Sequence, residues 1–130
     1  MLTFLALLFG WSSVRNCGTS TDRATIVDIT SNPANPVPGD NVTLAVKYAF
    51  AGEAITGGTA HYKATLNYFP VYDESFELCT QTKCPKEAGT YTEISNTLFP
   101  TGVSGKLVTT INWVDQTNTP IWCVETTWKV

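Results

Sequence analysis

The sequence has few charged residues, and basic residues are the scarcer kind. Charged side chains make up 15% of the 130 residues, and eight Lys and Arg against eleven Asp and Glu give a formal net charge of −3. An average soluble domain has about 25% charged residues, so this surface must be largely neutral and polar. The cations are too few for the basic face that a phosphate backbone needs, or for a polybasic patch on a membrane. Nucleic acid is therefore not an expected partner.

A hydrophobic run long enough to span a bilayer is also missing. Residues 1–11 are an uncharged apolar run, but a spanning helix needs ~20 such residues. The run matches the hydrophobic region of a secretion signal, and Ser12 and Ser13 are small enough for cleavage, although no Lys or Arg precedes it. We expect a signal peptide over residues 1–13, cleaved after Ser12 or Ser13, and one domain over residues 14–130. The alternative is an N-terminal core strand.

Signatures of catalysis and of metal binding are lacking too. The single histidine, His61, falls on the polar face of an expected strand, and the chain has no Gly-x-Ser-x-Gly motif. Asp73, Glu74 and Glu77 could form a carboxylate pair or a calcium site, but such clusters are more often solvated loops. The four cysteines lack the two C-x2-C pairs typical of structural zinc. We expect a protein that is not an enzyme and that binds no metal or cofactor.

In place of amphipathic helices, the sequence shows alternating apolar and polar residues. This period of two is typical of strands with one buried face. Strands are expected over residues 24–30, 42–50, 62–68, 90–98, 107–113 and 121–130. Residues 69–76 form an acidic stretch that is expected to be irregular. About seven short strands with turns at roughly 8–12-residue spacing predict an all-β protein with an antiparallel β-sandwich.

Four cysteines follow the expected signal, and their even number agrees with disulfides formed in an oxidising compartment. Four cysteines allow three pairings. Cys79 and Cys84 are close enough in sequence to close a small loop, and Cys17 would then pair with Cys123. That second disulfide would join the two ends of the domain and stabilise it by up to ~4–5 kcal/mol.

Aromatic residues are abundant, with four Trp, five Tyr and six Phe. Phe69, Tyr72, Phe76 and Phe99 lie in or beside expected loops. Large aromatic side chains usually pack in an ordinary core. The alternative is a cavity between splayed sheets with an aromatic mouth.

Several short motifs follow one another in a recognisable order. They are Asn16-Cys17, a Pro-rich turn that ends in Val37-Pro-Gly-Asp40, Cys79 with Cys84-Pro85, and Pro120-Ile-Trp-Cys-Val-Glu125. In this order they resemble the ML-domain lipid-recognition family over essentially the whole chain after the signal. The family's sterol carriers have six cysteines, and the additional pair would fall near residues 32–38, where this sequence has none.

The resemblance implies an immunoglobulin-like sandwich with splayed sheets and a lipid tail or sterol between them. The lining of the cavity is then expected to comprise Val46, Tyr48, Phe50, Tyr62, Ala64, Leu66, Tyr68, Leu107, Ile111 and Trp113. The mouth, placed by position in the family, is expected to comprise Phe69, Val71, Leu98, Phe99 and Val103. Phe99 is expected to be only partly buried there.

The expected function is that of a secreted carrier that takes up and transfers a sterol or a phospholipid. Such a carrier would act as a monomer in transient contact with membranes or a membrane lipid acceptor, outside the cell or in a lysosome-like lumen. The alternative is a secreted immunoglobulin-like recognition module without a lipid ligand. Asn41 begins the sequence Asn41-Val-Thr43, a glycosylation sequon, and we expect it to carry a glycan.

Overall fold

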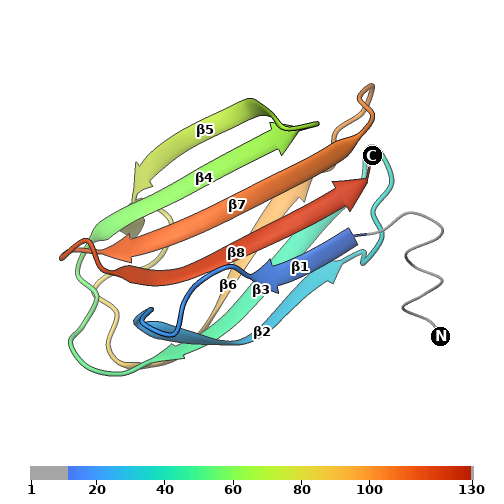
Figure 1. Cartoon of the computed structure of the whole chain (residues 1–130). Helices are drawn as coiled ribbons and strands as arrows, with labels where there is room; N and C mark the ends of the chain where they lie inside the picture. Colours follow the sequence, from blue (N-terminus) through green and yellow to red (C-terminus); the bar gives the residue numbers. More distant parts are fainter. Residues whose placement is uncertain (1–11, 130) are drawn as a thin grey trace.

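The computed structural model describes residues 12–129, which form two antiparallel β-sheets (Figure 1). In spatial order, the larger sheet contains β1 (Ser12–Asn16), β8 (Pro120–Lys129), β7 (Lys106–Asp115), β4 (Gly58–Leu66) and β5 (Phe69–Glu77). The smaller sheet contains β2 (Ala24–Asn32), β3 (Asn41–Phe50) and β6 (Gly89–Leu98). A short 3-10 helix, η1 (Leu78–Thr80), follows β5. The predicted β-sandwich is therefore confirmed, with eight strands among the described residues.

The alternation predicted for residues 42–50 is realised in β3. Its apolar residues are buried at every second position, and the residues between them are half-buried or exposed. Four of them, Leu44, Val46, Tyr48 and Phe50, belong to one core cluster with aromatic and aliphatic residues of β7 and β8, among them Trp113 and Trp122. Burial of one face on each sheet is the main driving force that holds the two layers together.

The sequence pattern does not predict two of the strands. β1 pairs with β8, so the predicted cleavage after Ser12 or Ser13 falls at the start of this strand, while residues 1–11 of the predicted signal lie outside the described part. β5 pairs with β4 along the acidic stretch that is predicted to be irregular. Every residue of β5 is exposed, and an edge strand with so little burial has no clear hydrophobic pattern.

The sandwich is closed along one side and open along the other. At the closed side, β1 of the larger sheet contacts β2 of the smaller one, and Cys17, just after β1, is bonded to Cys123 of β8. At the other side, β5 and β6 are the edge strands, and the segment that joins them contains the Cys79–Cys84 disulfide. The open side lies between β5 and β6 (Figure 1). Both disulfides are those predicted from the sequence.

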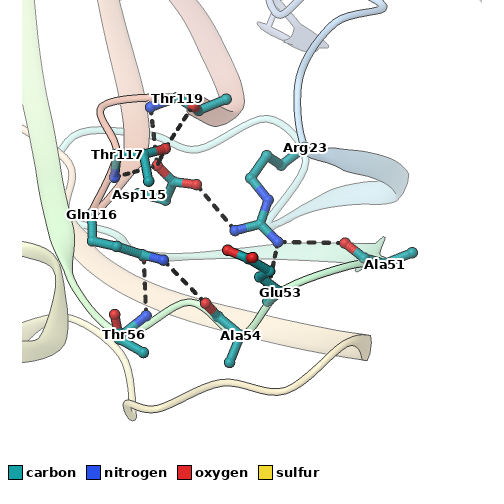
Figure 2. Close-up of polar contacts among 9 residues, drawn as sticks. All are labelled: Arg23, Ala51, Glu53, Ala54, Thr56, Asp115, Gln116, Thr117 and Thr119. Carbon is teal, nitrogen blue, oxygen red and sulfur yellow. Dashed lines mark hydrogen bonds and ion pairs between the residues drawn. The ribbon is translucent and has the colours of Figure 1, made fainter.

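A buried ion pair joins three loops at one end of the sandwich (Figure 2). Arg23 Nη1 donates to Asp115 Oδ2 at 3.0 Å, and these side chains are 15% and 3% exposed. Asp115 Oδ1 accepts hydrogen bonds from the backbone N–H groups of Thr117 and Thr119 and from the Thr117 hydroxyl. Arg23 also donates to the carbonyl of Glu53. The cluster thereby links the start of β2, the loop after β3 and the β7–β8 turn.

Candidate functional site

A cavity, which we call the outer cavity, lies between the two sheets at the open side. Its volume is about 470 Å³, and it is lined by Tyr62, Ala64, Tyr72, Phe76, Gln81, Thr97, Leu107 and Thr109. Thr97 comes from β6, Gln81 follows η1, and the other residues come from the larger sheet. Small-molecule pockets are typically about 300–1,000 Å³ and mostly apolar. The outer cavity therefore has the size and the lining of a site for a hydrocarbon ligand.

A smaller space, which we call the inner pocket, adjoins the outer cavity at Tyr62 and Gln81. Its volume is about 100 Å³, and it is lined by Leu44, Val46, Tyr62, Gln81, Glu93, Ile94, Ser95, Ile111, Trp113 and Trp122. Several of these residues are part of the main core cluster. The inner pocket thus lies against the core and shares Tyr62 and Gln81 with the outer cavity.

Edge strand β5 supplies the aromatic wall of the outer cavity. Its register places Phe76 opposite Ala60 and Tyr72 opposite Ala64, and directly opposite residues share one face of a sheet. Phe76 packs edge-on against the ring of Tyr62 with centroids 5.8 Å apart. Phe76 and Tyr72 are 38% and 46% exposed, so this wall can take up further contact with a ligand.

The facing strand β6 supplies a polar wall. Glu93, Ser95 and Thr97 are opposite buried residues of β3 in the register, so they lie on the inward face of the smaller sheet. Their side chains are a carboxylate and two hydroxyls. The space between the sheets is therefore amphipathic, with an aromatic side on β4 and β5 and a polar side on β6.

The carboxylate of Glu93 is fully engaged in polar contacts. It accepts a hydrogen bond of 2.7 Å from the Tyr48 hydroxyl and bonds of 3.0 and 3.1 Å from the Thr82 hydroxyl, and it forms an ion pair of 3.4 Å with Lys86 Nζ. Lys86 is buried, and its ammonium group lies 4.0 Å from the ring centroid of Tyr91. Burial, together with the bond to Glu93, raises the pKa of Tyr48 above its ordinary value, so the hydroxyl remains a donor.

Six of the ten residues predicted to line the cavity do line one of the two spaces. They are Val46, Tyr62, Ala64, Leu107, Ile111 and Trp113. Tyr48 and Phe50 point inward as predicted but are buried in the core and border neither space. Leu66 is half-buried and also borders neither.

The predicted positions of Phe99 and Leu98 at the mouth are wrong. Phe99 is 2% exposed and belongs to a second core cluster with Val42 and Trp128. Leu98 is paired with the exposed Asn41, so it lies on the outward face of the smaller sheet, away from the cavity. Phe99 follows Leu98 and remains hydrogen-bonded to Asp40 and Gly39, just before β3, so its side chain falls on the face opposite to that of Leu98 and is buried.

Tyr68 is also not a lining residue. It lies in the turn between β4 and β5, where Asn67 and Tyr68 both have positive φ, and it is 81% exposed. A two-residue turn with this backbone is typical of a tight hairpin, which the alternating pattern through residue 68 conceals.

Tyr68 forms an exposed surface patch with Phe69, Val71 and Val103, which we call the apolar tip. Phe69, Val71 and Val103 are 73%, 58% and 40% exposed, and neither the outer cavity nor the inner pocket includes them. The Asn67 side chain bonds to the backbone of Ser104 and Lys106, which holds the β4–β5 turn beside the β6–β7 loop. Phe69, Val71 and Val103, which are predicted from the sequence to form the mouth, thus lie on the surface and border neither space.

Much of the polar and aromatic lining has no signal in the apolar strand pattern. Gln81, Glu93, Ser95, Thr97 and Thr109 are polar, and a search for apolar strand faces passes over such residues. Leu44, Ile94 and Trp122 are missed as well, and Tyr72 and Phe76 are considered only in the alternative with an aromatic mouth, not among the expected lining residues. Tyr72 and Phe76 are four residues apart, so their side chains lie on the same face if the segment is a strand. This spacing is the one signal that could have revealed the aromatic wall.

The described residues offer no other evident chemical centre. Within residues 12–129, no three His, Cys, Asp or Glu side chains are close enough together to hold a metal ion. His61 Nε2 lies 2.6 Å from Asp73 Oδ1, but the pair is on the opposite face of the larger sheet from the cavity. None of the described segments forms a helix of the length and apolarity required to cross a bilayer.

Known proteins of one family are similar to this chain in sequence. A family model described as the ML domain matches residues 12–130. A protein of Dictyostelium discoideum named as a putative phosphatidylglycerol/phosphatidylinositol transfer protein is 29% identical over 119 residues, which cover 88% of this chain and 82% of that protein. A phosphatidylglycerol/phosphatidylinositol transfer protein from Mycosarcoma maydis is 30% identical over 95 residues, which cover 68% of this chain and 47% of that relative.

Two solved structures share the fold. A Niemann-Pick type C2 protein from the Japanese carpenter ant superposes with a TM-score of 0.68 at 15% identity, over 90% of this chain and 98% of that one. Chicken MD-1, crystallised in complex with lipid IVa, superposes with a TM-score of 0.55 at 13% identity, over 91% of this chain and 88% of that one. At these identities the two structures show a common architecture alone.

Proposed function

The chain belongs to the ML domain family, and on that premise we propose that it takes up a lipid between its two sheets and transfers it between membranes. The observation that carries the proposal is the outer cavity of about 470 Å³, which has an aromatic wall and opens between two edge strands. The family membership agrees with a carrier and not with an enzyme. The transferred ligand is a sterol or a phospholipid, and the named activity of the Dictyostelium relative supports the second.

The binding energy for such a ligand comes from apolar burial. Each CH₂ group removed from water contributes about 0.8 kcal/mol, so a tail that fills the outer cavity can leave a bilayer without covalent chemistry. Phe76, Tyr72 and Leu107 are partly exposed without a ligand, and a tail would cover them. An empty apolar space of this size is unfavourable, which favours a bound lipid as the normal state.

Transfer requires contact with a membrane, and the apolar tip is suited to it. Tyr68 and Phe69 are among the most exposed large hydrophobic residues of the described chain, and Lys106 Nζ lies 5.4 Å from the Tyr68 ring centroid. Lys129 is directly opposite Lys106 in the register of β7 and β8. We propose that the tip inserts between headgroups while these two lysines face anionic lipid.

The compartment and the state of the protein are part of the proposal. Two disulfides are expected in an oxidising environment, which supports secretion or an endomembrane lumen. Asn41 is exposed at the start of β3, as a glycan attachment site must be. We propose a monomer, because a single chain forms the whole cavity.

The proposal is tested by lipid extraction and by transfer between vesicles. Protein purified under native conditions is expected to yield a bound lipid on organic extraction, and to accelerate transfer of a fluorescent phospholipid or sterol. Ala64→Trp fills the outer cavity and should abolish transfer. Lys63→Trp, on the outward face of the same strand, is the matched control and should not. If repeated extraction yields no lipid and the protein transfers none of the lipids offered, the recognition module is favoured instead.

A further inference from the structure

The volume of the outer cavity limits how much hydrocarbon can enter between the sheets. An apolar protein cavity of about 150 Å³ binds one benzene molecule, which corresponds to about 25 Å³ for each carbon atom. At this packing the outer cavity, with its volume of about 470 Å³, holds about 19 carbon atoms. A single acyl tail of about 16 to 18 carbon atoms therefore fills it, whereas the two tails of a diacyl phospholipid need about twice the volume.

The inner pocket adds little room. Tyr62 and Gln81 line both spaces, and the Tyr62 hydroxyl donates to Gln81 Oε1 at 3.2 Å, so these two side chains stand between the outer cavity and the inner pocket. The inner pocket, at about 100 Å³, has room for about four further carbon atoms. Even together, the two spaces hold about 23 carbon atoms, fewer than the about 27 of cholesterol or the about 32 of two palmitoyl tails. Neither a whole sterol nor a second tail therefore fits between the sheets.

The charges of the lining determine which end of a lipid enters. Among the described residues, those that line the outer cavity include no charged side chain. The lining of the inner pocket includes one, Glu93, and its carboxylate already forms an ion pair of 3.4 Å with Lys86. A phosphate or carboxylate between the sheets would therefore lack a counter-ion, and burial of an unpaired charge is strongly unfavourable. The tail is the part that enters, and an anionic headgroup stays outside.

We propose that the outer cavity binds one acyl tail at a time, while the headgroup and any second tail of the same lipid remain outside the sheets. The inference rests on the proposed function and narrows its ligand from a sterol or a phospholipid to an acyl lipid. The partly exposed rings of Tyr72 and Phe76 lie along one side of the bound tail. Two sources supply such a tail, namely a diacyl phospholipid and a single-chain lipid such as a lysophospholipid.

A series of lysophosphatidylglycerols with different chain lengths tests the inference on the unmodified protein. Their affinities are measured by displacement of a bound fluorescent probe, below the critical micelle concentration of each lipid. Each added CH₂ group should tighten binding about 4-fold until the tail reaches about 19 carbon atoms, and further groups should add nothing. Native mass spectrometry should show one lysolipid for each protein molecule. Two bound lysolipids, or affinity that still rises beyond about 22 carbon atoms, would overturn the inference.

A variant of the lining should move this limit. Ala64 lines the outer cavity, and Ala64→Leu adds three carbon atoms to the side chain, so the longest tail that still gains affinity should shorten to about 16 carbon atoms. Lys63→Leu, on the outward face of the same strand, is the matched control and should leave the limit unchanged. The same limit in Ala64→Leu and in the wild-type protein would overturn the inference. The stoichiometry of the wild-type protein decides the matter independently if Ala64→Leu does not fold.

A spin-labelled lipid distinguishes the two sources of the tail. Phosphatidylglycerol with a nitroxide at the end of both tails should give an immobilised and a mobile signal of equal size when it is bound, because one tail lies inside and one outside. If this lipid does not bind and the lysolipid does, the tail comes from a single-chain lipid and the inference holds. Two immobilised tails would overturn it. Binding of cholesterol without binding of any acyl lipid would also overturn it and leave the carrier function intact. If no lipid binds, the carrier function fails and this inference fails with it.

Discussion

Phe99 packs edge-on against Trp128, with ring centroids 5.6 Å apart and an angle of 85° between the ring planes. The two residues are 2% and 7% exposed and form a separate core cluster with Val42. This contact joins the segment after β6 to the end of β8, so it fastens the two sheets together. It also explains why the segment after β6 does not form the entrance of the cavity.

Phe99→Ala should therefore lower stability and leave lipid binding unchanged. Loss of a buried Phe side chain costs about 3–5 kcal/mol, which for a domain of this size lowers Tm by roughly 10–20 °C. Leu98→Ala, at the exposed neighbouring position, is the control and should change Tm by little. Thermal melts and fluorescent-lipid binding measured below the melting range test both statements. A Phe99→Ala protein that melts normally but loses lipid would restore Phe99 to the mouth.

The features that the sequence predicts well are those with a strict periodic or covalent signal. The alternation in β3 places five apolar residues on one face, and only one register buries them all. The spacing of Cys79 and Cys84 likewise identifies one disulfide, and the other follows from it. The same alternation puts residues such as Val46, Ile111 and Trp113 on inward faces, and the resemblance to the ML-domain family identifies those faces as the lining.

The remaining site residues depend on relations that a strand pattern does not contain. Glu93 lies inward because its strand pairs with β3, and its charge is tolerated because Tyr48, Thr82 and Lys86 surround it. A sequence pattern shows neither fact, since Lys86 comes from a connecting segment. Tyr68 shows the opposite error, because it continues the alternation of β4 but falls in the turn.

Phe76→Ala should weaken lipid binding with a small effect on stability. Phe76 is 38% exposed, so its side chain contributes less to the folded core than to contact with a ligand and with Tyr62. Loss of an aromatic contact is worth about 0.5–1.5 kcal/mol, which corresponds to roughly 3- to 10-fold in affinity. Ser75→Ala, on the other face of β5, should bind as the wild type does. A fall of Tm by many degrees with unchanged affinity would show that Phe76 serves the core.

The Arg23–Asp115 pair predicts a dependence of stability on pH. Burial raises the pKa of Asp115, but the hydrogen bonds from Thr117, Thr119 and Arg23 outweigh this, and the net pKa lies below the ordinary value. The stabilisation is then complete above the unfolded pKa of about 3.9 and is lost as the pH falls through that value toward the lower folded pKa.

Asp115→Asn should remove this contribution. Deletion of one charge of a buried pair costs about 3 kcal/mol or more, because Arg23 is left without its counter-ion. Urea unfolding of the variant should show a lower free energy at pH 7 and a flatter loss of stability between pH 5 and pH 3. Asp73→Asn, in an exposed pair with His61, should cost less than about 1 kcal/mol. Equal pH profiles for wild type and Asp115→Asn would refute the assignment.

The two disulfides should differ in their effect on stability. The Cys17–Cys123 bond spans a sequence separation of 106, and the Cys79–Cys84 bond a separation of 5. The chain-entropy model gives about 5 kcal/mol for the first and about 2 kcal/mol for the second. The Cys79→Ser/Cys84→Ser double variant should remain folded at 25 °C, and the Cys17→Ser/Cys123→Ser variant should be far less stable in urea. The reverse order would show that the β5–β6 connection contributes more than its loop length predicts.

The apolar tip should determine binding to membranes independently of the cavity. Tyr68→Ser with Phe69→Ser removes two exposed aromatic rings, and co-sedimentation with phosphatidylglycerol-containing vesicles should fall about tenfold or more, while Tm stays nearly unchanged. Each basic residue near an anionic surface contributes about 1 kcal/mol, so Lys106→Glu should weaken binding to these vesicles and not to neutral ones. Val27→Ser, at an exposed apolar residue of β2, is the control and should bind as the wild type does.

Because the tip residues border neither the outer cavity nor the inner pocket, the aromatic variant should still take up lipid offered in detergent and should lose only vesicle-to-vesicle transfer. Normal transfer by this variant would show that the protein meets the membrane through another surface.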